Sequence, residues 1–196
     1  MKKKVAILAS GGGSNLQALL DAMKDPAYPA QAVLVFSDKA GAGALKRAEA
    51  AGVPTAHLDP KDFPGREAFD QAVAGLIREV GADLVCFAGY LRIITKALVQ
   101  PFAGRILNVH PALLPDFGGP GMYGIHVHEA VIRSGVKKSG ATVHWVTEGV
   151  DAGPILMQEE IPVLPGDDPE SLAARVLELE HRLYPKALEK ACRIQG

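Results

Sequence analysis

The sequence predicts an α/β domain with a Rossmann-like open sheet, mostly parallel with an antiparallel edge and with helices on both faces. Short runs rich in Val and Ile alternate with longer segments of helical periodicity, which is the pattern of βα units. The 196 residues, 48% of them hydrophobic, suit one compact domain. We therefore expect residues 1–196 to form a single domain.

The first half of the chain contains regular βα units. Buried strands are expected at residues 5–9, 33–37, 84–88 and 106–110, where Val, Ile, Leu and Phe cluster. Helices are expected between them, at residues 16–23, 42–51 and 66–80, and each of these ends at a glycine or proline. This alternation favours a parallel sheet.

The second half departs from this rhythm. Residues 111–124 are rich in proline and glycine and show little periodicity, so we expect a long functional loop. A helix at 126–133 and two strands at 141–146 and 155–163 follow, and the strand pair can add an antiparallel edge. A last helix is expected after Asp168, with Pro169 in its first turn, and Pro185 is expected to kink or restart it.

Charge and composition exclude several classes of protein. The chain has 21 basic and 22 acidic residues, so its net charge of -1 argues against a nucleic-acid-binding protein. No segment reaches the roughly 18 apolar residues of a membrane span. Two cysteines, Cys86 and Cys192, form no disulfide framework, which suits the cytoplasm. We expect small-molecule partners, no nucleic acid, no membrane, and a monomer or homodimer.

A glycine-rich turn lies between the first strand and the first helix, with the sequence Ser-Gly-Gly-Gly-Ser-Asn over residues 10–15. Free backbone N–H groups and the positive end of the helix dipole would point into this turn. It lacks the spacing of a dinucleotide or nucleoside triphosphate loop, so a phosphate monoester is the favoured ligand. The alternative is a tight structural turn capped by Ser14 or Asn15.

Asn108 and His110 lie two residues apart at the end of a predicted strand, so their side chains leave on the same face. Ligands bind at the carboxyl ends of strands in open α/β sheets. The structural alternative is an Asn and a hydrogen-bonded core histidine. Asp151, between Gly149 and Gly153, belongs to a loop that could cross the same edge, or it could merely form a turn.

Four histidines between residues 110 and 144, together with Asp151, leave a metal site open as an alternative. His126 and His128 are spaced i, i+2, so they do not share the helix face that an i, i+4 zinc pair uses. His144 alternates with apolar neighbours and is expected to face inward. The sequence assigns no role to these three histidines.

Longer motifs resemble a known family over nearly the whole chain. They are Ser-Gly-Gly-Gly-Ser-Asn-Leu-Gln-Ala (10–18), Gly-Arg-Glu-Ala-Phe-Asp (65–70), Ala-Gly-Tyr-Leu-Arg-Ile-Ile (88–94), Asn-Val-His-Pro-Ala-Leu-Leu-Pro (108–115), His-Val-His (126–128), Thr-Val-His-Trp-Val-Thr-Glu-Gly-Val-Asp-Ala-Gly-Pro (142–154) and Arg-Val-Leu-Glu-Leu-Glu-His (175–181). The chain resembles the glycinamide ribonucleotide transformylases, or phosphoribosylglycinamide formyltransferases, of the folate-dependent formyltransferase superfamily. Residues 118–124 depart from the resemblance, since the shortest members have fewer residues there.

The resemblance implies a one-carbon transferase of de novo purine (IMP) biosynthesis. Such an enzyme transfers the formyl group of 10-formyltetrahydrofolate to the amino group of glycinamide ribonucleotide, giving formylglycinamide ribonucleotide and tetrahydrofolate. Related tRNA formyltransferases and formyltetrahydrofolate deformylases carry an additional domain, for which 196 residues leave no room. We expect residues 1–105 to bind the ribonucleotide phosphate and residues 106–196 to bind folate and catalyse the transfer.

The resemblance also implies a role for individual residues. Asn108, protonated His110 and Asp151 would be catalytic, with the first two donating hydrogen bonds to the oxyanion and Asp151 keeping His110 charged. Substrate binding would fall to Gly13, Ser14, Asn15 and Glu180. The formyl folate, a co-substrate that needs no metal, would contact Arg66, Leu91, Arg92, Ile93, Ile94, Asn108, Thr147, Glu148, Gly149, Val150 and Asp151.

Two other functions use the same features. A hydrolase releasing formate from the folate would need the same Asn, His and Asp, and it would produce formate without an amine acceptor. A non-catalytic sensor built on the glycine-rich turn would bind the ribonucleotide without turnover. The sensor leaves the joint occurrence of Asn108, His110 and Asp151 unexplained.

Overall fold

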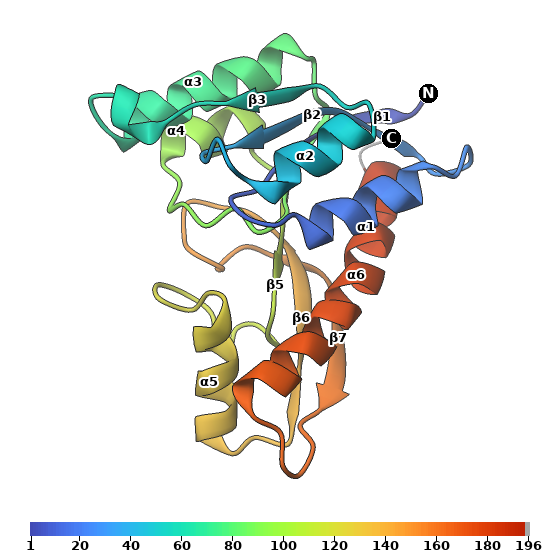
Figure 1. Ribbon diagram of the computed structural model, residues 1–196, viewed down its shortest axis with the longest axis vertical. Coiled ribbons are helices and arrows are strands. Elements are labelled where there is room, and N and C mark those ends of the chain that lie inside the picture. Colours follow the sequence, from blue (N-terminus) through green and yellow to red (C-terminus); the bar gives the residue numbers. More distant parts are fainter. Residues whose placement is uncertain (195–196) are drawn as a thin grey trace.

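A seven-stranded sheet forms the centre of the protein, which we describe over residues 1–194 of a computed structural model (Figure 1). The strands lie in the order β3-β2-β1-β4-β5-β6-β7. Their bounds are β1 Lys3–Leu8, β2 Ala30–Ser37, β3 Thr55–His57, β4 Leu84–Phe87, β5 Ile106–His110, β6 Lys138–Trp145 and β7 Ile155–Pro162. The predicted α/β class and open sheet are confirmed.

The strands β1 to β5 pair in parallel, whereas β6 pairs antiparallel with both β5 and β7. This confirms the predicted antiparallel edge. The chain order reverses between β1 and β4, where β1 is flanked by β2 on one side and β4 on the other. In open α/β sheets such a point leaves a crevice at the carboxyl ends of the strands, where ligands bind.

Six α-helices and two short 3₁₀ turns accompany the sheet in the described residues. They are α1 Ser14–Met23, α2 Gly43–Ala50, α3 Arg66–Glu79, α4 Lys96–Val99, α5 Ile125–Ser134 and α6 Pro169–Ile194, with 3₁₀ turns at Pro60–Asp62 and Gln100–Phe102. Alternate strand residues bury on opposite faces: Val5 and Ile7 join the core under α1, α2 and α6, and Ala6 and Leu8 join the core under α3 and α4. Helices therefore cover both faces, as predicted.

Two short elements were not predicted, and the expected restart of the last helix at Pro185 was wrong. Strand β3 has three residues and helix α4 has four, which is too short for a periodic signal. The last helix does not restart at Pro185, because α6 is continuous from Pro169 to Ile194. Its neighbours hold it there: Tyr184 Oη donates to the carbonyls of Phe87 and Leu107, at 3.0 and 3.1 Å, and Tyr28 Oη donates to the Pro185 carbonyl at 2.7 Å.

The loop at 111–124 lies between β5 and α5 and contains no helix or strand, as expected. Its first half is tied to the sheet, because Thr142 Oγ1 accepts from the Leu114 amide (3.1 Å) and donates to the Ala112 carbonyl (2.6 Å). Gln158 Nε2 donates to the Leu114 carbonyl at 3.0 Å. Over residues 1–194, no helix combines the length and apolarity needed to cross a membrane.

Candidate active site

A cavity of about 720 Å³ opens at the carboxyl ends of β1, β4 and β5. Its walls come from the segments that follow β4 and β5, from the loop between β6 and β7, and from α1, α5 and α6. The volume is within the range of small-molecule sites. All three predicted catalytic residues line it, together with Asn15 and Glu180.

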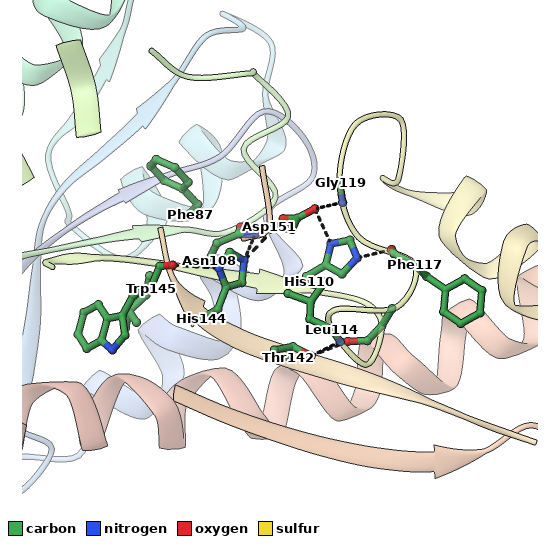
Figure 2. Close-up of polar contacts among 12 residues, drawn as sticks. Phe87, Asn108, His110, Leu114, Phe117, Gly119, Thr142, His144, Trp145 and Asp151 are labelled. Carbon is green, nitrogen blue, oxygen red and sulfur yellow. Dashed lines mark hydrogen bonds and ion pairs between the residues drawn. The ribbon is translucent and has the colours of Figure 1, made fainter. Parts of the chain in front are cut away.

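Asn108, His110, His144 and Asp151 form one polar cluster on the floor of the cavity (Figure 2). His110 Nδ1 lies 3.6 Å from Asp151 Oδ2, and His144 Nε2 lies 3.6 Å from Asp151 Oδ1. Asn108 Nδ2 is 3.1 Å from His144 Nε2, as expected for residues paired across β5 and β6. The sheet register therefore places a second histidine beside the three residues implied by the resemblance.

A backbone carbonyl faces one ring nitrogen of each of these histidines. His110 Nε2 is 2.8 Å from the Phe117 carbonyl, and a carbonyl only accepts, so Nε2 carries the proton. In neutral His110 the unprotonated Nδ1 then faces Asp151. His144 Nδ1 is 3.1 Å from the Trp145 carbonyl, which places its Nε2 between Asn108 Nδ2 and Asp151 Oδ1.

Burial and the neighbouring polar groups act in opposite directions on the charge of His110. Burial lowers the pKa of His110, and the opposing effects of the Asp151 carboxylate and the Phe117 carbonyl do not cancel it. The net effect favours the neutral imidazole. Burial also raises the pKa of Asp151, but contacts with His144, His110 and the Gly119 amide lower it further, so Asp151 stays ionised.

The backbone around Asp151 is shaped by its neighbours. Asp151 itself has φ 52°, in the left-handed region, and its Oδ2 accepts from the Gly119 amide at 3.0 Å. A Cβ at Gly153 would lie 1.7 Å from the Trp145 carbonyl oxygen, so only glycine fits where the loop enters β7. The flanking glycine therefore allows the loop to bring Asp151 over the strand ends.

The glycine-rich turn reaches the helix without a side-chain cap. Gly13 is the N-cap of α1, with φ 76°, and no side chain bonds to the first turn, so the alternative of a cap by Ser14 or Asn15 is wrong. Because the first N–H groups of a helix have no partner within it, these donors remain for a ligand. Gly11 and Gly12 have open space at their Cβ positions.

Asn15 and Glu180 connect this turn to the last helix. Asn15 Nδ2 donates to Glu180 Oε2 at 2.7 Å, and Glu180 is 6% exposed. Burial raises the pKa of Glu180 to about 7, although the hydrogen bond from Asn15 opposes the shift. Glu180 is thus partly protonated near neutral pH, and its polar head lies on the cavity wall beside Asn15.

The predicted folate-binding residues divide into two groups. Residues 91–94 and 147–151 line the cavity from opposite loops, and Leu91 and Ile93 are each 57% exposed. Arg66, at the first position of α3, forms the second group, because it is not among the residues that line the cavity. Within the first group, the guanidinium of Arg92 lies over the Phe69 ring. Gly13 and Ser14 also lie outside the lining, next to Asn15.

Sequence reasoning missed several residues at the site. Arg47, on α2, donates from Nε to the Gly12 carbonyl at 2.7 Å and so places a cation beside the glycine-rich turn. Phe87 and Val146 add apolar wall, and the buried His128 lines the cavity near His110. Arg47 and Phe87 lie outside the motifs of the sequence and reach the site through tertiary packing, whereas His128 and Val146 lie within two of those motifs but had no assigned role.

The four histidines between residues 110 and 144 do not converge on one point. His110 and His144 flank Asp151, His128 lies on the α5 wall, and His126 is exposed and pairs with Glu129 at 3.1 Å. Among residues 1–194, no three His, Cys, Asp or Glu side chains gather in a way that could hold a metal ion.

Comparisons with known proteins agree with this geometry. A family model described as formyl transferase matches residues 3–188. The chain is 40% identical over 181 residues to phosphoribosylglycinamide formyltransferase from Escherichia coli, covering 92% of this chain and 83% of that protein. It is also 46% identical over 188 residues to the chicken trifunctional purine biosynthetic protein adenosine-3, of whose length it spans 18%.

A crystal structure of phosphoribosylglycinamide formyltransferase from Brucella melitensis superposes with a TM-score of 0.91 at 49% identity, covering 98% of this chain and 96% of that one. Glycinamide ribonucleotide transformylase 1 from Geobacillus kaustophilus gives the same TM-score at 37% identity over the full length of both chains. The chain therefore belongs to the phosphoribosylglycinamide formyltransferases of the formyl transferase family.

Proposed function

We propose that this chain transfers the formyl group of 10-formyltetrahydrofolate to the amino group of glycinamide ribonucleotide. One observation carries the proposal: a single cavity joins the Asn15–Glu180 pair beside the glycine-rich turn to the cluster of Asn108, His110 and Asp151. A phosphorylated amine held at the first end would present its nitrogen at the second.

The phosphate end suits a monoester. The uncapped N-terminus of α1 supplies backbone donors at Gly13, Ser14 and Asn15, and Arg47 adds a fixed positive charge behind Gly12. Asn15 Oδ1 is buried without a partner, and Glu180 lies next to it. These two groups would accept hydrogen bonds from the hydroxyls of a ribose.

The opposite end suits a reduced folate. Leu91, Ile93 and Val150 expose apolar surface on facing walls, where a flat ring system would be held between them. We propose that Arg66 contacts an acidic part of the folate that extends beyond the cavity. Under this proposal residues 1–105 mainly bind the phosphate, and residues 106–196 carry out catalysis and bind the folate. Glu180 is the exception, because it lies in the second part but binds the ribonucleotide.

Attack of the amine on the formyl carbon forms one C–N bond and creates an oxyanion and an ammonium. Asn108 has a second Nδ2–H, beyond the one bonded to His144, that can donate to the oxyanion. A single such donor contributes about 10² to 10³ in rate. The site must then move a proton from the ammonium to N10 of the folate as the bond from N10 to carbon breaks.

His110 and Asp151 are arranged for that proton transfer. Asp151 is ionised and can take the ammonium proton directly or through a water molecule. Asp151 can pass this proton on to the free Nδ1 of neutral His110, which faces it, and the imidazolium that forms is stabilised by the restored carboxylate. The charged His110 would then stabilise the oxyanion by its positive charge, because both of its N–H groups already face other acceptors. General acid–base catalysis of this kind contributes about 10² to 10⁴.

Tetrahydrofolate formation from 10-formyltetrahydrofolate, measured with and without glycinamide ribonucleotide, tests the proposal. We expect formation to depend on the ribonucleotide and to yield its formyl derivative in equal amount. Free formate without the ribonucleotide would instead identify a hydrolase, and tight ribonucleotide binding without turnover would identify a sensor. The two buried free cysteines, Cys86 and Cys192, agree with a proposed location in the cytoplasm.

A further inference from the structure

The segment from Gly89 to Thr95, which follows β4, has two different sides. Leu91 and Ile93 are more than half exposed on the cavity wall. Arg92, between them, has a side chain only 22% exposed, and its guanidinium lies against α3 and the end of β2. The residues that would touch a folate are thus carried by a segment whose charged side chain is packed behind it.

Arg92 makes two contacts behind the wall. Its guanidinium carbon lies 4.5 Å from the centroid of the buried Phe69 ring, a distance at which a cation–π interaction is favourable. Its NH1 lies 4.0 Å from Asp38 Oδ2, and the Asp38 side chain is 8% exposed. A carboxylate this buried requires a positive partner, and in the described residues Arg92 is the cation within ion-pair distance.

Two further hydrogen bonds hold the same segment from behind. Asp70, which is fully buried on α3, accepts from the Thr95 amide at 2.6 Å. Ser10 Oγ, at the end of β1, accepts from the Leu91 amide at 3.0 Å. The segment is therefore fixed near its start by β1, at its end by α3, and at its centre by Arg92.

We propose that Arg92 is a positioning residue for the formyl donor, acting through Asp38 and Phe69 rather than by contact with the donor's carboxylates. The inference rests on the proposed function and deepens it. The central anchor sets the position of Leu91 and Ile93 and of the backbone between them. Its loss would let this wall move away from a flat ligand while leaving Asn108, His110 and Asp151 in place.

The first test is the effect of Arg92→Met on the two substrates separately. We expect the KM for 10-formyltetrahydrofolate to rise about tenfold, the scale of one partly buried cation–π contact and one ion pair. The kcat and the KM for glycinamide ribonucleotide should stay within about twofold. Arg78→Met removes the same charge from an exposed position on α3 and should change none of these values.

The second test separates positioning from direct contact. Dissociation constants of tetrahydrofolate and of tetrahydropteroate, which lacks the glutamate and its two carboxylates, are measured by calorimetry for wild type and Arg92→Met. Positioning predicts the same fold-loss for both ligands, because both use the wall. A loss confined to tetrahydrofolate would show that Arg92 binds a carboxylate and would overturn the inference.

A double-mutant cycle tests the route through Asp38. Asp38→Asn alone should weaken tetrahydropteroate binding. The double variant Asp38→Asn/Arg92→Met should bind no more weakly than Arg92→Met alone, because Arg92→Met has already removed the ion pair between the two residues. Additive losses would contradict the inference. Arg92→Lys keeps a cation and should restore part of the affinity, and it serves as the test if Arg92→Met does not fold. A wild-type protein that binds folate but transfers no formyl group would refute the proposed function alone.

Discussion

The two ends of the cavity are built in different ways. The end beside the glycine-rich turn, which we propose binds phosphate and call the phosphate end, combines an uncapped helix N-terminus and glycines without side chains with the Arg47 cation, which donates to a backbone carbonyl. The catalytic end consists of side chains from β5, β6 and the loop before β7, each held by a named partner. The first end binds charge with fixed dipoles, whereas the second must change its protonation during a reaction.

The two ends also differ in their response to pH. At the phosphate end burial dominates and raises the pKa of Glu180, whereas at the catalytic end polar neighbours outweigh burial and lower the pKa of Asp151. One carboxyl is therefore ready to hold a proton near neutral pH, and the other stays ionised. This contrast supports the proposed roles of hydrogen bonding for Glu180 and proton transfer for Asp151.

Asp151→Asn is expected to give the largest effect. The amide cannot accept the ammonium proton or stabilise charged His110, so kcat should fall by about 10² to 10⁴. Asparagine tolerates the left-handed conformation at φ 52°, so the melting temperature should change little. Steady-state kinetics and thermal unfolding of the purified variant measure both quantities.

Asp116→Asn is the matched control, since Asp116 is exposed in the neighbouring loop and should retain full activity. His110→Ala should lower kcat over the same range as Asp151→Asn. If either catalytic variant turned over at near-normal rate, the assignment of this cluster to the chemistry would be wrong. Equal losses in the control would point instead to a general effect on the loop.

Glu180 is expected to make stability fall as pH rises. Its folded pKa of about 7 exceeds the ordinary value of 4.5, so the folded state retains a proton that the unfolded state has released. The contribution is full below pH 4.5, is lost as pH rises to about 7, and stays lost above it, a change on the order of 3 kcal/mol. Urea unfolding of the protein between pH 5 and 8 measures this slope.

Glu180→Gln removes the titration while its side-chain oxygen can still accept from Asn15. This variant should lose the corresponding part of the slope and be more stable than wild type at pH 8. Glu178→Gln, on the exposed face of the same helix, should keep the wild-type slope. An unchanged slope in Glu180→Gln would mean that Glu180 is not the group that titrates.

The contrast between the two ends explains which parts the sequence could predict. The glycine-rich turn is local, so residues 10–15 alone indicated an anion site, and Asn108 and His110 are neighbours on one strand. The contact of His110 with Asp151 depends on the β5–β6–β7 order, and the bond from Asn15 to Glu180 joins residues 165 positions apart. The glycine-flanked loop indicated Asp151 and the family resemblance supplied Glu180, but Arg47 and the position of His144 beside Asp151 came only from tertiary packing.

Gly13→Ala is expected to damage the phosphate end through the backbone. Gly13 has φ 76°, and a Cβ there would lie 2.7 Å from the Ala44 Cα, so both the turn and α2 must shift. We expect a loss of about 2 kcal/mol in unfolding free energy. The KM for glycinamide ribonucleotide should rise about tenfold or more, with a smaller change in kcat.

Gly52→Ala is the control for the conformational part of this effect. Gly52 also has a positive φ, 71°, but its Cβ position is open. It should therefore cost about 1 kcal/mol of stability and leave the KM unchanged. If Gly13→Ala resembled Gly52→Ala in both measurements, contact with Ala44 would not be what holds the turn in place.

The smallest effect is expected from His126→Ala, which tests whether the catalytic end extends to every nearby histidine. The His126 side chain is 55% exposed, and it contacts Glu129 one helical turn away and the edge of Tyr123. Exposed pairs of this kind contribute well under 1 kcal/mol, so stability and kcat should both stay at wild-type values. His144→Ala, by contrast, removes the acceptor that orients Asn108 and should lower kcat while leaving the KM for the ribonucleotide near normal. A large loss of activity in His126→Ala would require the loop at 111–124 to close so that this exposed histidine reaches the substrate. His126, in the first turn of α5, would then belong to the catalytic cluster and not to the surface.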